Sequence, residues 1–198
     1  MTKKKIAIAI AAAALAGTCA IGGTLAWLTA TTNEVTNTFT VGNIQLNLDE
    51  LPVDEDGIVD EDGTRVTEQK HPYKVYPSAT IKKDPKVDVI ENSEDCWLYV
   101  YVTNNTEAEG ADGTAIDFSM ASDWQAVSGL SGLYRYKDEK VTAPLTDVSV
   151  FANDTVTVDE GITDEITGEI TVKAYAHQAE GVEMTEADAA AIAFFTGE

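Results

Sequence analysis

The densest group of side chains that could do chemistry is a run of carboxylates between residues 54 and 63. The run reads Asp-Glu-Asp-Gly-Ile-Val-Asp-Glu-Asp-Gly, and its two Asp-x-Asp-Gly units contribute four candidate calcium ligands: Asp54, Asp56, Asp60 and Asp62. Ca²⁺ binds several oxygen ligands on a loop that glycine bends sharply. The EF-hand spacing is not met, because Gly57 or Ile58 stands at the third ligand position and no Glu closes the loop. The spacing favours the alternative, a solvated acidic hairpin whose Asp-Gly steps form turns.

Sequence patterns typical of hydrolases are absent. The two histidines, His71 and His177, are far apart, and no His-Glu-x-x-His zinc motif, Gly-x-Ser-x-Gly elbow or Gly-rich phosphate loop occurs. His71 precedes Pro72 in a polar stretch and His177 ends an apolar stretch, so we expect both at or near the surface. Because neither is paired with a recognisable nucleophile, the sequence predicts no catalytic residue and no enzyme activity.

Cys96 is the only cysteine after residue 30, and it precedes the apolar run 97–102. A buried free cysteine behaves as a small hydrophobic residue. A reactive thiol needs neighbours that lower its pKa, whereas Glu94 and Asp95 would raise it. We therefore predict a buried, unreactive thiol; an intermolecular disulfide or a nucleophile is the alternative.

The charge of the chain excludes two classes of partner. The 198 residues carry a formal charge of −21, and the residues after position 30 hold 10 basic against 34 acidic groups, a net of −24. Nucleic acids and anionic lipid surfaces attract clustered Lys and Arg, so we expect no binding to either. A hydrophobic share of 44% is too high for a disordered acidic chain, and the length suits a single domain.

The first 30 residues have the pattern of an export signal. Three lysines at 3–5 precede the apolar run 6–21, and a small residue stands at position 30. We predict a signal peptide over residues 1–30, cut after Ala30 or alternatively after Ala26, and one domain over residues 31–198. The chain would thus meet the membrane only before this cut. Two alternatives are an uncleaved membrane anchor and a lipoprotein cut before Cys19. The anchor is disfavoured because no basic stop-transfer flank follows the apolar run, and the lipoprotein because the usual Leu three residues before the cysteine is missing.

Short stretches of alternating polarity predict a β-rich domain. Residues 35–48 place Ile44, Leu46 and Leu48 on one face of a half-buried strand, and residues 96–103 are apolar on both faces, as in a central strand. We expect the acidic insertion 49–72 to contribute nothing to the core. Further strands are expected at 81–90, 116–119, 124–127, 133–137, 145–151, 155–158 and 165–177, the last interrupted at Gly168.

Two local signals complete the fold prediction. Pro85 restricts the stretch 81–90 to a strand start, a bulge or a sheet edge. Thr185 and Asp188 have the spacing of a capping box and open an Ala-rich run to Phe195, which predicts a short C-terminal helix. The predicted fold is an all-β, jelly-roll-like β-sandwich with an N-terminal signal peptide and a short C-terminal helix.

Several stretches carry a family pattern. Gly-Gly-Thr-Leu-Ala-Trp-Leu-Thr-Ala at 22–30 is followed by Asn-Thr-Phe-Thr-Val-Gly-Asn-Ile-Gln-Leu at 37–46. Further matches are Lys-Asp-Pro-Lys-Val at 83–87, Cys-Trp-Leu-Tyr-Val-Tyr-Val at 96–102 and Val-Lys-Ala-Tyr-Ala-His-Gln-Ala-Glu-Gly at 172–181. Together they resemble the TasA/camelysin family of exported Gram-positive proteins, which carry a SipW-type signal.

This resemblance implies a jelly-roll sandwich secreted to the exterior or cell surface of a Gram-positive bacterium, after cleavage by a signal peptidase of the SipW type. It implies a subunit of extracellular fibres or biofilm matrix that has further copies of itself as its partner. Family fibres assemble by donor-strand exchange, and the freed segment here would be Thr31, Thr32, Asn33, Glu34, Val35, Thr36, Asn37 and Thr38. Camelysins carry the label of metallopeptidase, but this chain lacks the zinc motif.

The properties of the segment 31–38 suit such pairing. It is β-prone, has no Pro, carries one charge at Glu34, and offers Val35 and Phe39 as apolar pegs. The alternatives are a flexible tail at 31–38, and a monomeric secreted binding module that holds Ca²⁺ or a surface partner through residues 49–65. Since bodies with a net charge of −24 repel each other, we expect assembly to depend on Ca²⁺ or salt, and we expect no other cofactor.

Overall fold

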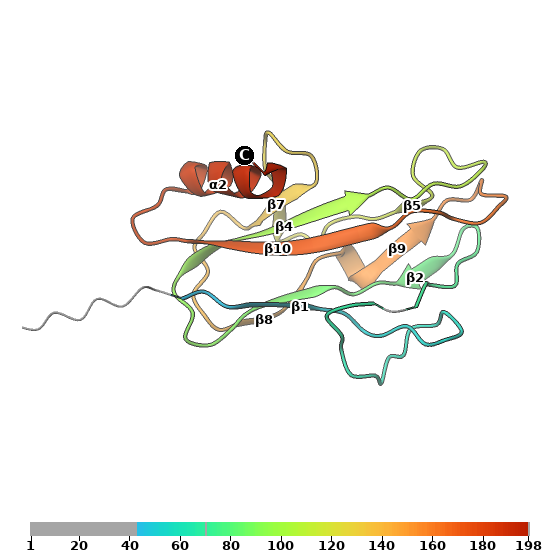
Figure 1. Ribbon diagram of the computed structural model, residues 1–198, viewed down its shortest axis with the longest axis horizontal. Helices are drawn as coiled ribbons and strands as arrows, with labels where there is room; N and C mark the ends of the chain where they lie inside the picture. Colours follow the sequence, from blue (N-terminus) through green and yellow to red (C-terminus); the bar gives the residue numbers. More distant parts are fainter. Residues whose placement is uncertain (1–42, 70, 198) are drawn as a thin grey trace, which may run out of the picture. The chain divides into compact units, whose positions relative to one another are not determined.

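The computed structural model of the chain describes residues 43–69 and 71–197 (Figure 1). The chain divides into two units, Met1–Val41 and Gly42–Glu198, and every described residue belongs to the second. The predicted signal peptide and the segment 31–38 therefore lie outside the described residues. No helix among the described residues is long and apolar enough to cross a membrane.

The centre of the second unit is a four-stranded antiparallel sheet in the order β10-β4-β7-β6. Its strands are β4 (Cys96–Asn104), β6 (Trp124–Ala126), β7 (Leu133–Tyr136) and β10 (Ile170–Gln178). β4 pairs with β10 along its whole length and with β7 on its other side. The run that is apolar on both faces thus forms a central strand, as predicted.

A second layer consists of six shorter strands in two antiparallel sheets, ordered β1-β3-β8 and β2-β9-β5. In chain order these strands are β1 (Leu46–Asp49), β2 (Thr80–Lys82), β3 (Lys86–Val89), β5 (Ile116–Asp117), β8 (Leu145–Ser149) and β9 (Thr155–Val158). Residues Ala152–Asp154 form a turn of 3-10 helix, η1, between β8 and β9.

The two small sheets continue each other across a bend. The Lys83 N–H donates to the Asp154 carbonyl at 2.9 Å, and the Val150 N–H donates to the Pro85 carbonyl at 3.0 Å. Pro85 stands directly before β3 and needs no ladder N–H there, which confirms a strand start at this proline.

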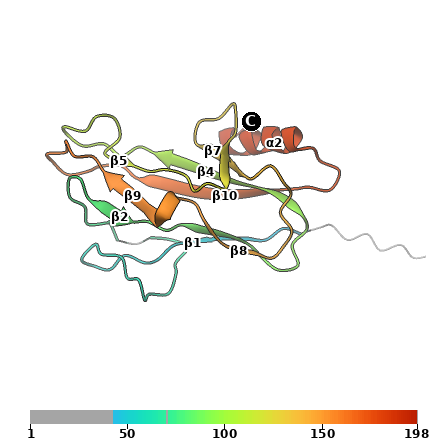
Figure 2. The ribbon, with the colours of Figure 1, turned by 180° about the vertical axis from the view of Figure 1, so that it is seen from behind.

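Side chains alternate along β4 between two cores. Even positions point into the inner core between the two layers, which includes Leu98, Val100, Val87 and Val89. Odd positions point into an outer core beneath the helix α2 (Met184–Thr196), which includes Trp97, Tyr99, Ala187 and Ala191. Figures 1 and 2 show α2 lying over the sheet that contains β4 and β10. The fold is therefore an all-β sandwich with one short C-terminal helix, which confirms the predicted class.

Asp188 fastens α2 to the sheet. Its carboxylate accepts hydrogen bonds from Arg135 Nη1 at 2.6 and 2.7 Å and from the Tyr99 hydroxyl at 2.9 Å. Arg135 is buried on β7 and also pairs with Asp138. Burial acts to lower the pKa of Arg135, but its hydrogen bonds to Asp188 and Asp138 outweigh burial and raise it. The arginine therefore stays charged beneath the helix.

The capping box predicted at 185–188 is wrong. α2 begins at Met184 with Glu183 at the N-cap, and no side chain caps it. Thr185 lies inside the first turn, and the Asp188 carboxylate is held by Arg135 and Tyr99 instead. A charged tertiary hydrogen bond is stronger than a local cap, so the matching spacing is overridden.

The acidic insertion also departs from its prediction. Leu51 and Val53 are buried, so residues 49–72 do contribute apolar side chains to the interior. Two isolated bridges, Glu50 with Val66 and Val53 with Val59, fold the segment back on itself. The sequence does not predict this arrangement, because the buried residues of the insertion are few and exposed carboxylates follow them.

We predict that Asp188→Asn lowers the free energy of unfolding by about 2–3 kcal/mol, because it leaves a buried guanidinium short of its anionic partner. Urea unfolding followed by circular dichroism measures this loss. Glu180→Gln removes the same charge from an exposed position and is expected to change stability by less than about 0.5 kcal/mol. Equal effects of the two substitutions would contradict the anchoring role of Asp188.

Candidate functional site

One side of the sandwich is bounded by two sheet edges. β10 ends the four-stranded sheet, β1 ends the sheet β1-β3-β8, and the two strands contact each other across the layers (Figure 1). Half-buried apolar side chains of β1 and β10, together with Ile44 just before β1, pack against the inner core. We call this set the seam; it consists of Ile44, Leu46, Leu48, Ile170, Val172, Ala174 and Ala176. The predicted apolar face of Ile44, Leu46 and Leu48 is thereby confirmed.

The outer edge of β10 is long and regular. β10 pairs with β4 in one unbroken register from Ile170 opposite Asn104 to Gln178 opposite Cys96. The Asn105 N–H donates to the Glu169 carbonyl, and the Ala179 N–H donates to the Asp95 carbonyl. These two bonds show which residues of β10 are hydrogen-bonded to β4. Odd residues of β10 bond to β4, so the backbone groups of Val172, Ala174 and Ala176 point away from it. No strand of the described part of the chain lies on that side.

A glycine fixes where β10 starts. Gly168 has a φ of +82°, and a Cβ there would stand 2.2 Å from the Asn105 carbonyl oxygen, so a larger residue would clash. The next N–H, from Glu169, donates to the Asn105 Oδ1 at 2.6 Å. The predicted interruption at Gly168 is confirmed, and the straight part of the edge begins at Ile170.

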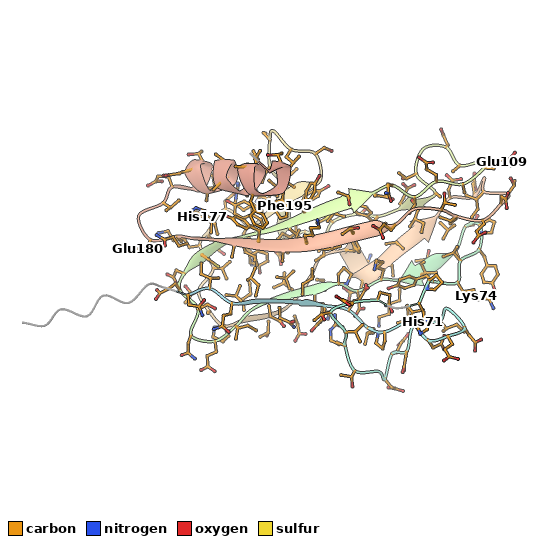
Figure 3. All side chains as sticks on the ribbon, viewed as in Figure 1. His71, Lys74, Glu109, His177, Glu180 and Phe195 are labelled. Atoms are coloured by element: carbon orange, nitrogen blue, oxygen red, sulfur yellow. The ribbon has the colours of Figure 1, made fainter. Side chains whose placement is uncertain are left out.

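A half-open cleft of about 780 Å³ lies at the Ile170 end of the seam. Its apolar lining includes Ile81, Ile116, Val156, Ile162 and Ile170. Its carboxylates are Glu50, Asp164, Glu165 and Glu169, and Lys83 is the only Lys or Arg among the lining residues. In Figure 3, His71 marks this end of the molecule, whereas His177 lies toward the other end of β10. The cleft therefore suits apolar or cationic groups and disfavours anions.

Two clusters of ion pairs tie the acidic insertion to the body. Arg65 donates to Asp49 and to Asp84 Oδ2, the latter at 2.7 Å, and Asp84 Oδ1 accepts the Leu51 N–H at 3.0 Å. Asp84 is buried. Burial acts to lower the pKa of Arg65, but its hydrogen bonds to Asp84 and Asp49 raise it, so the guanidinium keeps its charge.

The second cluster forms one wall of the cleft. Lys83 Nζ pairs with Glu50 at 2.5 Å, and the Tyr73 hydroxyl donates to the same carboxylate at 3.3 Å. Burial, followed by the charge of Glu50, raises the pKa of Tyr73 well above its ordinary value. Tyr73 is therefore a neutral hydrogen-bond donor at this wall, and no reactive phenolate forms there.

The candidate calcium ligands sit on two tight turns. Asp54 Oδ1 accepts the N–H groups of Asp56 and Ile58, both at 2.9 Å, and Asp60 Oδ1 accepts the Asp62 N–H at 3.2 Å. These are the turns that the Asp-Gly interpretation predicts. Within residues 43–69 and 71–197, no three His, Cys, Asp or Glu side chains are grouped to hold a metal ion.

The histidines and the cysteine lie as predicted. His71 is exposed at the cleft, and His177 is half-buried, with its Nδ1 3.0 Å from the Gln178 carbonyl. Cys96 is a buried free thiol. Burial, with a smaller contribution from the charge of Asp95, raises the pKa of Cys96 to about 11. The thiol is therefore neutral and unreactive at physiological pH.

Sequence reasoning misses the ion pairs and the cleft. Arg65 is the only basic residue between positions 49 and 69, which is a signal that it has buried anionic partners. The Lys-Asp-Pro stretch, noted only for its family resemblance, supplies Lys83 and Asp84 to the two clusters. Ala30 and the segment from Thr31 to Thr38 lie outside the described residues, and the structure does not bear on them.

Comparison with known protein families concerns the N-terminal third of the chain. Residues 1–62 match the camelysin metallo-endopeptidase family. The match spans the predicted signal peptide, β1 and the two Asp-Gly turns as far as Asp62, and it confirms the resemblance to the TasA/camelysin family. No curated protein and no solved structure matches the chain significantly. The name of the family implies a bound metal ion, and the described part of this chain holds no group of three side chains that could bind one.

We predict that Arg65→Leu lowers the free energy of unfolding by about 3 kcal/mol, because it leaves Asp84 charged and buried without its partner. Lys82→Leu is the matched control, since Lys82 and Glu61 form an exposed ion pair at 4.0 Å. Its expected effect is under about 1 kcal/mol. Urea unfolding measures both, and an Arg65→Leu effect no larger than the control would show that the cluster does not hold the insertion.

We also predict a loss of stability at alkaline pH that depends on Cys96. The folded state keeps the thiol proton up to a pKa of about 11, whereas the ordinary value is 9.0, so the unfolded state releases the proton first. The stabilisation is present below pH 9 and is lost as the pH rises toward 11. Between pH 8 and 11 the wild type should lose roughly 2–3 kcal/mol more than Cys96→Ala, measured by urea unfolding at each pH. Parallel pH profiles of the two proteins would refute this.

Proposed function

We propose that the chain is a secreted structural protein, the subunit of an extracellular fibre or biofilm matrix of a Gram-positive bacterium. In this proposal a signal peptidase of the SipW type cuts after Ala30 and frees the segment 31–38. That segment then pairs with the sheet of a second copy, by donor-strand exchange. The camelysin match supports export, because it begins at residue 1 and spans the predicted signal peptide.

The observation that carries the proposal is the free edge of β10 beside the half-buried seam. Its outward N–H and C=O groups can form a ladder with an added strand, as in β-augmentation. An extended segment of eight residues spans about 26 Å, and the nine residues of β10 span about 30 Å. Val35 and Phe39, four residues apart, share one face of an extended strand and can cover the seam together.

The position of Asn43 favours an open chain of subunits. The Asn43 carbonyl accepts the Glu94 N–H at 3.0 Å, so the described chain starts at the loop between β3 and β4. A donor segment of one copy and an acceptor edge of another are unlike parts of the chain, so their pairing is head-to-tail. Head-to-tail pairing gives a filament when the rotation does not close a ring.

Charge opposes this assembly. The processed chain carries a net of −24, so neighbouring bodies repel until salt or Ca²⁺ screens them. Ca²⁺ acts here as a counter-ion, and binding at Asp54, Asp56, Asp60 and Asp62 is the alternative. If Ca²⁺ acts only as a counter-ion, assembly depends on ionic strength and any salt serves. If Ca²⁺ binds at the aspartates, other salts do not replace it.

We predict that the secreted form assembles into filaments and that deletion of residues 31–38 leaves folded monomers. The deletion removes the donor strand but none of the residues of the described body. Sedimentation velocity and negative-stain microscopy at two salt concentrations measure assembly, and circular dichroism measures folding.

A single substitution supplies a matched control. Val35→Asp places a charge on the face that would cover the seam and should prevent assembly, whereas Thr31→Asp adds the same charge at the start of the segment and should reduce it little. The donor-strand proposal fails if the truncated protein polymerises as well as the secreted form, or if the secreted form stays monomeric under all ionic conditions.

A second candidate function, a metallopeptidase, is favoured by the name of the matched family. It requires a bound metal ion and hydrolysis of a protein such as casein by the purified chain. Zinc found by metal analysis, together with metal-dependent casein hydrolysis, would favour this function over a structural role.

A further inference from the structure

Phe194 on α2 is the most exposed of the large apolar side chains in the described part of the chain, at 61%. It stacks on Tyr175 of β10, with ring centroids 4.6 Å apart and planes at 24°. Its neighbour Phe195 packs on Tyr101 of β4 at 4.9 Å and on Phe194 at 5.0 Å. We call these four residues the aromatic cluster. Tyr175 lies on the edge strand β10, so its stacking places Phe194 over that strand. Figure 3 shows Phe195 between α2 and the sheet.

The aromatic cluster and the seam lie on opposite faces of β10. Even residues of β10, such as Ala174, face the inner core, whereas odd residues, such as Tyr175, face the helix. A strand added at this edge would therefore have two neighbours. Its inner side chains would meet the seam, and its outer side chains would meet Tyr175 and Phe194.

The segment before β1 has a pattern that matches both faces. Its odd positions are Thr31, Asn33, Val35, Asn37, Phe39 and Val41, and its even positions are Thr32, Glu34, Thr36, Thr38 and Thr40. Val35, Phe39 and Val41 on the inner face suit the seam, where the small Ala174 and Ala176 leave room beside the incoming side chains; the two asparagines share that face. An outer face of Thr suits the aromatic cluster, because pairs of aromatic and β-branched residues stabilise adjacent strands.

The charges of this outer face agree with the same placement. Tyr175 is flanked two residues away on either side by Lys173 and His177, on the same face of β10. If Thr36 lies opposite Tyr175, Glu34 lies opposite Lys173 in a parallel pairing or His177 in an antiparallel pairing. The single acidic residue of the segment thus meets a basic side chain in either direction.

Resting on the proposed donor-strand function, we propose that Phe194 and Tyr175 form the outer wall of the site that accepts residues 31–41 of a second copy. The C-terminal helix is then part of the assembly surface as well as a cover for the outer core. Its exposed phenylalanine is explained by the strand that covers it in the fibre.

The test compares Phe194→Ser with Ile58→Ser in the secreted form. Ile58 is almost equally exposed, at 57%, and lies on the acidic insertion outside the seam and the aromatic cluster. We expect Phe194→Ser to raise the critical concentration for filament formation at least tenfold and Ile58→Ser to leave it within twofold. Thermal unfolding followed by circular dichroism should give the same midpoint for both variants and the wild type, because both side chains are exposed.

Cross-linking gives a readout of proximity. Chains that carry Thr36→Cys are mixed with chains that carry Phe194→Cys and are oxidised, and a two-chain disulfide species that needs both substitutions is expected. Ile58→Cys in place of Phe194→Cys should give none. The background is low because Cys96 is buried.

The outcomes separate this inference from the function on which it rests. If deletion of 31–38 abolishes filaments but Phe194→Ser assembles as the wild type does and no cross-link forms, the donor strand stands and the outer wall is wrong. If the deletion leaves filaments intact, the proposed function itself fails. If the double variant Thr36→Cys and Phe194→Cys closes a disulfide within one monomer, the segment covers its own sheet and both proposals are overturned.

Discussion

The structure depends on one constraint, that β4 is apolar on both of its faces. Leu98 and Val100 need cover on one side, and Trp97 and Tyr99 need cover on the other. The second layer of strands supplies the first cover and α2 supplies the second, so a two-layer sandwich becomes a three-layer body. With both faces covered, the sheet can be extended only at its edges, which are the three-residue β6 and the nine-residue β10. β10 is the longer of these two edges, and no strand of the described residues pairs with its outer side.

Three cations of this acidic chain lie against carboxylates that are buried or half-buried. Arg65 lies against Asp49 and Asp84, Lys83 against Glu50, and Arg135 against Asp188. Each pair joins segments that are distant in sequence, so charge holds the insertion and the helix to the sandwich where apolar contacts are few. The remaining carboxylates are left largely without cations, and the surface of the body is strongly acidic. The same distribution that stabilises one body makes two bodies repel, so it favours contacts between bodies that are apolar or made by the backbone.

The sequence predicts the positions of single strands and turns well, and it predicts poorly which side chains and strands they contact. β4 and β9 are found almost to the residue, because their apolar patterns are strong and their flanks are polar. The interruption at Gly168 is found because only glycine suits that turn. The capping box fails because Asp188 has a stronger partner on β7, 53 residues away in sequence, which no local pattern reveals. The sequence makes no prediction of the edge position of β10. Strand order is a property of the whole sheet, whereas polarity along one strand reports only its two faces.

Strand direction bears on how a further strand could join the edge of β10. β1 is antiparallel to β3, which leads into β4, and β10 is antiparallel to β4, so β1 and β10 run in opposite directions. A strand added at the outer edge of β10 can run parallel or antiparallel to it, and antiparallel pairs are slightly more stable per residue. Every strand pair in the described part of the chain is antiparallel. A strand added antiparallel to the outer edge of β10 would therefore continue the pattern of the body, with each of its residues adding to the ladder.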